Sequence, residues 1–110
     1  MGKTSREKGK RGEREFAALC RKHGFNEARR GQQFNGIEGK DVVGLPGFHV
    51  EVKRVERLNL SAAMDQAQED AAEGEIPIVA HRKNREPWRI TIAAEEFLKI
   101  IKTKEDRDEY

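Results

Sequence analysis

The sequence predicts a single α/β domain in which a mixed sheet of four or five strands is flanked by helices. Apolar residues recur at helical spacing in some segments and in short strand-like runs in others, in the order helix, strands, helix, strands, helix. The chain has 110 residues, which is enough for one small core. No repeat or linker divides it, so we assign residues 11–103 to the domain, residues 1–10 to a basic flexible arm and residues 104–110 to a frayed tail.

The first half of the chain predicts one helix and one hairpin. A helix is expected from about Arg11 to His23, where the helical spacing of apolar residues ends. Residues 25–40 are rich in glycine and polar side chains, and we expect a loop with at most one short strand. The runs KDVVGL and FHVEVKRV follow, separated by the turn-forming pair Pro46-Gly47. We expect these two runs to pair as a β-hairpin.

The second half predicts a helix, a second pair of strands and a closing helix. The segment LSAAMDQAQEDAAEGE places its apolar residues on one helical stripe, with Ser61 as a candidate N-cap and Gly74 as the stop. The strands IPIVAHR and WRITIAA are expected to pair across the turn KNREP. A short helix, EEFLKIIK, is expected to close the fold.

The composition excludes several classes of protein. The chain is 35% apolar and 38% charged, and no run approaches the ~18 apolar residues that cross a bilayer. Its basic start has no apolar segment behind it that would make a signal peptide. Its single cysteine, Cys20, excludes an internal disulfide framework and a Cys-rich zinc site. We therefore expect a cytoplasmic protein without a membrane partner.

The charge is distributed unevenly along the chain. Residues 1–30 hold ten Lys and Arg against four Asp and Glu, whereas residues 31–75 hold four against nine. A basic block followed by an acidic block suggests that one part binds a polyanion while carboxylates gather in another. Solvated charged faces without any partner would give the same pattern.

The run FHVEVKRV carries the residues with candidate chemistry. Because side chains alternate along a strand, Glu51 and Lys53 share one face with His49. Asp41 lies ten positions before Glu51, and the intervening turn folds its strand back alongside, so two carboxylates and a lysine can meet. The opposite face is expected in the core and carries Phe48, Val50 and Val52.

Two carboxylates beside a lysine suit phosphodiester hydrolysis. A hard cation such as Mg²⁺ takes carboxylate oxygens as ligands, lowers the pKa of a bound water and stabilises charge on the scissile phosphate. Lys53 can orient that water or neutralise the developing negative charge, and His49 can contact the phosphate. The alternative is a cross-strand salt bridge between Lys53 and either carboxylate, with His49 an ordinary half-exposed strand residue.

The spacing of these residues resembles a nuclease signature. Asp41, nine intervening residues and then Glu51-Val52-Lys53 are similar to the motif of the PD-(D/E)XK nucleases. The proline that usually precedes the aspartate is replaced here by Lys40.

The rest of the chain, over roughly residues 8–93, resembles the archaeal and phage Holliday-junction resolvases of that superfamily. Their first helix begins Glu-Arg-Glu, as the segment from Glu13 does, and ends in a Gly-Phe pair like Gly24-Phe25. Their next helix carries a glutamine at the distance of Gln66, and their closing hairpin matches IPIVAHR and WRITI.

The resemblance implies a restriction-endonuclease-like core and Mg²⁺-dependent endonucleolytic cleavage of DNA by water, with Mn²⁺ able to replace Mg²⁺. It also implies a homodimer that cuts two opposed strands, no organic cofactor, and the cytoplasm of a bacterium, an archaeon or a phage-infected host cell. The site residues it implies are Asp41, Glu51 and the backbone carbonyl of Val52 as metal ligands, Glu13 as a ligand directly or through water, Lys53 for the nucleophile or the transition state, and Gln66 in support.

Other interpretations stay open on the residues alone. Glu13 is also explained as a first-turn glutamate favoured by the helix dipole, and Gln66 lies off the apolar stripe of its helix. The protein could be a phage-type nuclease acting on flaps, nicks or duplex DNA, or a non-catalytic DNA-binding module. The residues we single out for contact with DNA phosphates are Lys8, Lys10, Arg11, Arg14, Arg29, Arg30 and Arg54.

Overall fold

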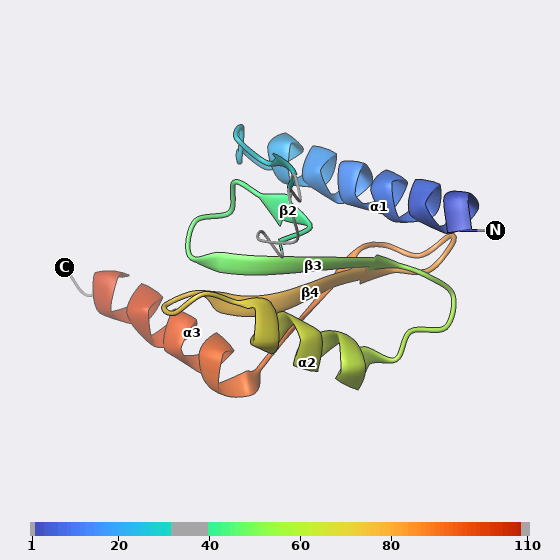
Figure 1. The fold of residues 1–110 in the computed structure, drawn as a ribbon. Coiled ribbons are helices and arrows are strands. Elements are labelled where there is room, and N and C mark those ends of the chain that lie inside the picture. The colour runs from blue at the N-terminus through green and yellow to red at the C-terminus, as the bar shows by residue number, and fades with distance from the viewer. Residues whose placement is uncertain (1, 32–39, 109–110) are drawn as a thin grey trace.

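The computed structural model describes residues 2–31 and 40–108 and confirms an α/β fold with a five-stranded mixed sheet flanked by helices (Figure 1). The strands lie in the order in which they occur along the chain. The elements are α1 (Gly2–Lys22), β1 (Arg29–Arg30), β2 (Val42–Val43), β3 (Phe48–Arg54), α2 (Leu60–Asp70), β4 (Ile76–Arg82), β5 (Arg89–Ile92) and α3 (Ala94–Asp108).

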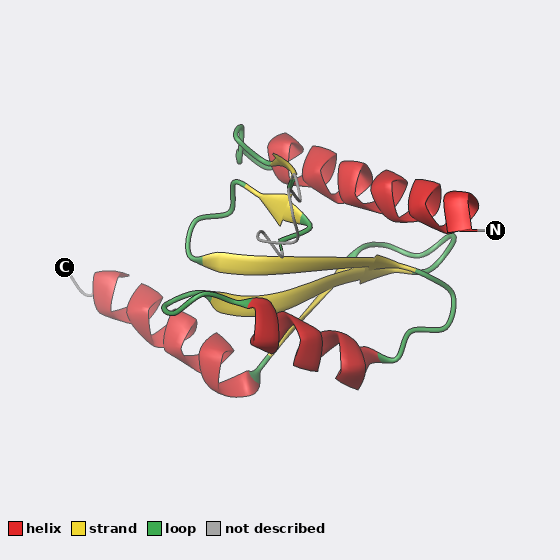
Figure 2. Cartoon of the chain, viewed as in Figure 1, coloured by secondary structure: helices red, strands yellow, loops and turns green. Residues whose placement is uncertain are grey.

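The sheet contains one parallel and three antiparallel pairs of strands. The expected hairpin is present, with β2 antiparallel to β3 and Val42 opposite Val50. β3 and β4 run parallel along their whole length, and α2 forms the crossover between them (Figure 2). β5 then returns antiparallel to β4, with His81 opposite Arg89. β2 is only two residues long, so the second half of β3 extends beyond it.

The alternation of side chains along β3 builds two cores on opposite faces of the sheet. Val50 and Val52 pack in the larger core with Phe16 of α1, as the sequence predicts for that face. The smaller core lies under α2 and contains Ala63, Ala67 and Val79. α1 and α2 therefore cover opposite faces of the sheet (Figure 1). No helix in the described parts of the chain is both long and apolar enough to cross a membrane.

Both terminal helices are longer than the sequence pattern predicts. α1 begins at Gly2, so residues 2–10, which the sequence pattern predicts as a basic flexible arm, are helical. α3 continues to Asp108, so residues 104–108 of the expected frayed tail are helical too. Apolar spacing reports only the part of a helix that packs on the sheet, whereas charged pairs such as Lys104 with Asp108 support a solvated extension. Residues 109–110 lie outside the described part.

The caps of α2 also differ from the prediction. Asn59, not Ser61, is the N-cap, and its Oδ1 accepts a hydrogen bond from the Ala62 N–H at 3.0 Å. The helix ends at Asp70, and Gly74 lies in the following turn with a positive φ of 86°.

Gly12 of α1 packs closely against β3. A Cβ added there would lie 2.9 Å from the Cβ of Arg54 and 3.8 Å from Cγ1 of Val52. Gly9, one turn earlier in the same helix, has nothing within 4 Å of such an atom.

Gly12→Ala is therefore expected to lower the free energy of unfolding by about 1–2 kcal/mol, because overpacking outweighs the gain in helix propensity. The matched control is Gly9→Ala, which is expected to raise it by up to ~1 kcal/mol. Urea denaturation of both variants measures the difference. Equal effects of the two substitutions would show that α1 does not approach β3 as closely as described.

Candidate functional site

Asp41 directly precedes β2 and is hydrogen-bonded to the backbone of β3. Its N–H donates to the Val50 carbonyl at 2.9 Å, and its carbonyl accepts from the Gly31 N–H at 2.9 Å. Its Oδ2 accepts a hydrogen bond from the Val52 N–H at 2.8 Å. The N–H and C=O of one strand residue point to the same edge, so the Val52 carbonyl also faces the side of β3 on which Asp41 lies.

Glu51 shares a water-poor site with Asp41. The Glu51 residue is 6% exposed. Burial, the nearby Asp41 charge and a hydrogen bond from the protonated Glu51 carboxyl to Asp41 raise the pKa of Glu51 to about 8. Burial also raises the pKa of Asp41, against the hydrogen bond from the Val52 N–H that lowers it. The two carboxyl groups thus compete for one proton. A bound cation would favour the ionised form of both.

Lys53 and Glu13 complete this cluster from two sides. The Lys53 charge favours the ionised forms of both Asp41 and Glu51, and so lowers the pKa of each. Glu13 approaches from α1, where burial and the charge of Asp41 raise its pKa. Arg30 Nε donates to Glu13 Oε1 at 3.4 Å. Electrostatic interactions thus link Glu13, Asp41, Glu51 and Lys53, which come from α1, from the residue before β2 and from β3. We call this set the acidic cluster.

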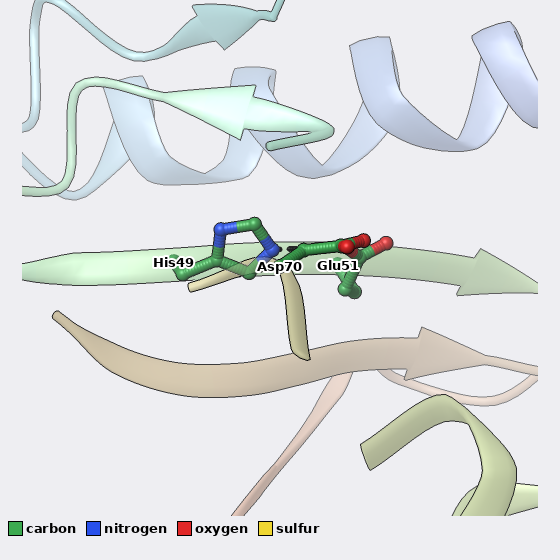
Figure 3. Close-up of side chains that lie close together, drawn as sticks. All are labelled: His49, Glu51 and Asp70. Atoms are coloured by element: carbon green, nitrogen blue, oxygen red, sulfur yellow. Dashed lines mark hydrogen bonds and ion pairs between the residues drawn. The ribbon is translucent and has the colours of Figure 1, made fainter. Parts of the chain in front are cut away.

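Glu51 also belongs to a second group of ligating side chains, with His49 and Asp70 (Figure 3). His49 Nε2 lies 2.8 Å from Glu51 Oε1, and ligating atoms of His49, Glu51 and Asp70 all lie within 4.8 Å of one another. His49 is only 1% exposed, and burial lowers its pKa, so it is neutral at neutral pH. His49 thus lies deeper than the half-exposed residue that the sequence suggests.

Asp70 is the residue at this site that the sequence analysis missed. It is the last residue of α2, and its charge adds to the rise in the pKa of Glu51. Gln66 Nε2 donates to Asp70 Oδ2 at 2.7 Å. Gln66 itself is exposed, so it reaches the acidic cluster through Asp70. Gln66 and Asp70 are four residues apart, about one helical turn, and this spacing was the feature of the sequence that could have predicted their contact.

The cations expected to contact DNA fall into two groups. Lys8, Arg11, Arg14 and Arg29 are exposed, and Lys10 is half-buried. Arg30 and Arg54 are instead engaged by the protein itself: Arg30 pairs with Glu13, while Arg54 Nη1 donates to Asn84 Oδ1 at 3.0 Å and its Nε lies 3.3 Å from Glu15 Oε2.

Glu15 joins α1 to the ends of two strands and to Trp88, a role that the sequence analysis did not assign. It pairs with Arg54 at the end of β3 and with Arg82 at the end of β4. Its Oε1 also accepts a hydrogen bond from the Trp88 indole N–H at 3.1 Å, next to β5. Truncating Glu15 would leave two arginines unpaired, so we regard it as a structural residue.

The fold and this site define an α/β protein with one buried and two half-buried carboxyl groups and a lysine near a central strand. Comparison with family models, with curated proteins and with solved structures found no match to this chain.

The raised pKa of Glu51 makes stability depend on pH. Between its ordinary value of 4.5 and about 8, the folded protein holds a proton that the unfolded chain has lost. The free energy of unfolding should therefore fall as pH rises through this window, by up to ~1.4 kcal/mol per pH unit. A bound cation favours the carboxylate, so the stabilisation by Mg²⁺ should grow with pH.

Urea denaturation at several pH values, in Mg²⁺ and in EDTA, measures both trends. The difference between wild type and Glu51→Gln isolates this carboxyl, because His49 remains in both proteins. Identical pH profiles of the two proteins would contradict the raised pKa.

Proposed function

We propose that this protein is a Mg²⁺-dependent endodeoxyribonuclease that hydrolyses phosphodiester bonds, with four-way DNA junctions as its substrate. The observation that carries the proposal is the acidic cluster, in which the Asp41 and Glu51 carboxyl groups share a hydrogen bond in a desolvated site and are both influenced by the Lys53 charge. We assign the mixed sheet, with its acidic hairpin and parallel β3–β4 pair, to a restriction-endonuclease-like core.

The donor atoms of the acidic cluster are of the chemical type that binds Mg²⁺. Carboxylate oxygens of Asp41, Glu51 and Glu13 and the carbonyl of Val52 are hard ligands, which Mg²⁺ prefers and Mn²⁺ also accepts. When bound, the ion would lower the pKa of a coordinated water and stabilise negative charge on the scissile phosphate. No organic cofactor enters the proposal.

The protein side chains supply positioning and charge. Asp41 is fixed by the Val52 N–H, and Glu51 by its contact with His49, so neither carboxyl has to be ordered when the site fills. The Lys53 charge acts on both carboxyl groups, and its ammonium group would orient the attacking water or neutralise charge in the transition state. Gln66 acts through its hydrogen bond to Asp70.

The proposal includes a homodimer, because a junction is resolved by symmetric cuts in two opposed strands. The exposed Phe97, Leu98 and Ile101 of α3 form an apolar surface that self-association could cover. Sedimentation equilibrium measures the oligomeric state, and a monomer at working concentrations would contradict this part of the proposal.

Cleavage of a labelled four-way junction and of a linear duplex with the same sequence, in Mg²⁺ and in EDTA, tests the function. We expect Mg²⁺-dependent cleavage of the junction and little cleavage of the duplex. Equal cleavage of both would favour the nuclease of flaps, nicks or duplex DNA. Binding of DNA without any Mg²⁺-dependent cleavage would contradict the proposal and favour the non-catalytic DNA-binding module.

A further inference from the structure

A cavity of about 660 Å³ lies beside the carboxyl ends of β3 and β4. It is lined by residues 56–60, which lead from β3 into α2, by residues 81–83 at the end of β4, and by residues 86, 87 and 89 at the start of β5. We call this cavity the basic pocket. It contains none of the residues of the acidic cluster.

The basic pocket carries cations that the protein does not neutralise. Arg57, Lys83 and Arg89 line it and are exposed, and none of them forms an ion pair with any acidic group in the described parts of the chain. The acidic residues Glu56 and Glu86 also line it. Glu56 Oε2 accepts a hydrogen bond from the Asn84 N–H at 2.7 Å. The three unpaired cations outnumber these two acidic residues, so the pocket has a net positive charge that suits an anion.

The start of α2 adds to this positive potential. Asn59 and Leu60 line the pocket, so the N-terminal end of an 11-residue helix borders it. The partial positive charge at a helix N-terminus favours anions, and it acts here together with three side-chain cations. Leu58, Leu60 and Pro87 supply the apolar part of the wall.

The strand register connects the basic pocket to the acidic cluster. Lys53 of β3 is directly opposite His81 of β4, and His81 is opposite Arg89 of β5. Residues paired in this way point to the same face of a sheet, on strands about 4.8 Å apart. Lys53, His81 and Arg89 therefore form a row across one face, and the row runs from the acidic cluster into the pocket.

We propose that the basic pocket binds a backbone phosphate of the same DNA molecule whose scissile phosphate lies at the acidic cluster. The pocket is then a positioning site that holds the substrate along the row from Lys53 to Arg89. This inference rests on the proposed function for the nature of its ligand. Phosphate contacts of this kind contribute affinity and salt dependence without reading sequence.

The test is the double variant Arg57→Gln/Arg89→Gln, compared with Lys102→Gln/Arg107→Gln, which removes the same charge from α3 outside the pocket. Fluorescence anisotropy with a labelled four-way junction in EDTA, over a range of salt concentrations, gives affinity without cleavage. We expect the pocket variant to bind roughly tenfold more weakly, with a slope of log K against log salt shallower by about 2. The unfolding midpoint of each variant checks that it is folded.

Wild-type affinity and salt slope in the folded pocket variant would overturn the inference, as would equal losses in the α3 variant. Binding of inorganic phosphate that depends on Arg57 and Arg89 but leaves the affinity for DNA unchanged would assign the pocket to free phosphate and also overturn it. The proposed function is judged separately, by cleavage in Mg²⁺. If wild type cleaves DNA and the pocket variant binds it as wild type does, only the inference about the pocket is contradicted. If the pocket variant binds DNA more weakly but wild type does not cleave it, only the proposed nuclease activity is contradicted.

Discussion

Glu51→Gln is expected to reduce Mg²⁺-dependent DNA cleavage by roughly 10²–10³-fold or more while leaving the fold intact. The substitution removes a carboxylate that the proposed ion requires, but glutamine fills the same volume and can keep the contact with His49. It also relieves the competition with Asp41 for one proton, so the free energy of unfolding should not fall at neutral pH. Single-turnover cleavage rates with saturating protein measure the loss.

The control for Glu51→Gln is Glu73→Gln, which makes the same chemical change at an exposed position after α2. It should cleave at the wild-type rate. Anisotropy in EDTA should show that Glu51→Gln still binds DNA. A Glu51→Gln protein that binds DNA and cleaves it at the wild-type rate would exclude the acidic cluster as the active site.

Lys53→Met is expected to lower the cleavage rate by about 10²-fold with little loss of Mg²⁺ affinity. The Lys53 charge acts on the carboxyl groups but an ammonium group is not a metal ligand, so its loss should affect the reaction rather than the binding of the ion. Lys53→Arg should restore little activity, because a planar guanidinium differs in shape and hydration from a compact ammonium. Cleavage rates at saturating Mg²⁺, together with calorimetric Mg²⁺ affinities, separate the two effects.

Lys22→Met, at the exposed end of α1, is the control for a lost positive charge. If both methionine variants lose the same small amount of activity, Lys53 contributes only general attraction to DNA. That result would leave the acidic cluster without its proposed charge stabiliser.

The sequence carried most of the information on the sheet and on the pairing of Asp41 with Glu51. A Pro-Gly turn between two strand-like runs determines that these runs pair, and the alternation along β3 determines which side chains share a face. These are local features, in which a two-residue period and a short turn leave few alternatives. The burial of Val50 and Val52 against α1 follows from the same alternation.

The residues that the sequence analysis missed depend on how distant elements pack. Asp70 lies close to Glu51 because α2 packs on the sheet with its last turn near β3. The periodicity of apolar residues within one segment does not predict how a helix crosses a sheet. The ion pairs of Arg30 with Glu13 and of Arg54 with Glu15 likewise depend on how α1 packs against the sheet. Single-residue charge does not reveal such pairing.

The most direct measurement is isothermal titration of Mg²⁺ into wild type and Asp41→Asn near neutral pH, in two buffers of different ionisation enthalpy. Wild type should bind Mg²⁺ and release about one proton, since the raised pKa of Glu51 leaves its carboxyl protonated until the ion arrives. Asp41→Asn should bind at least about tenfold more weakly and release less. Equal affinity in the two proteins, or no Mg²⁺ binding by wild type, would contradict a metal centre built from Asp41 and Glu51.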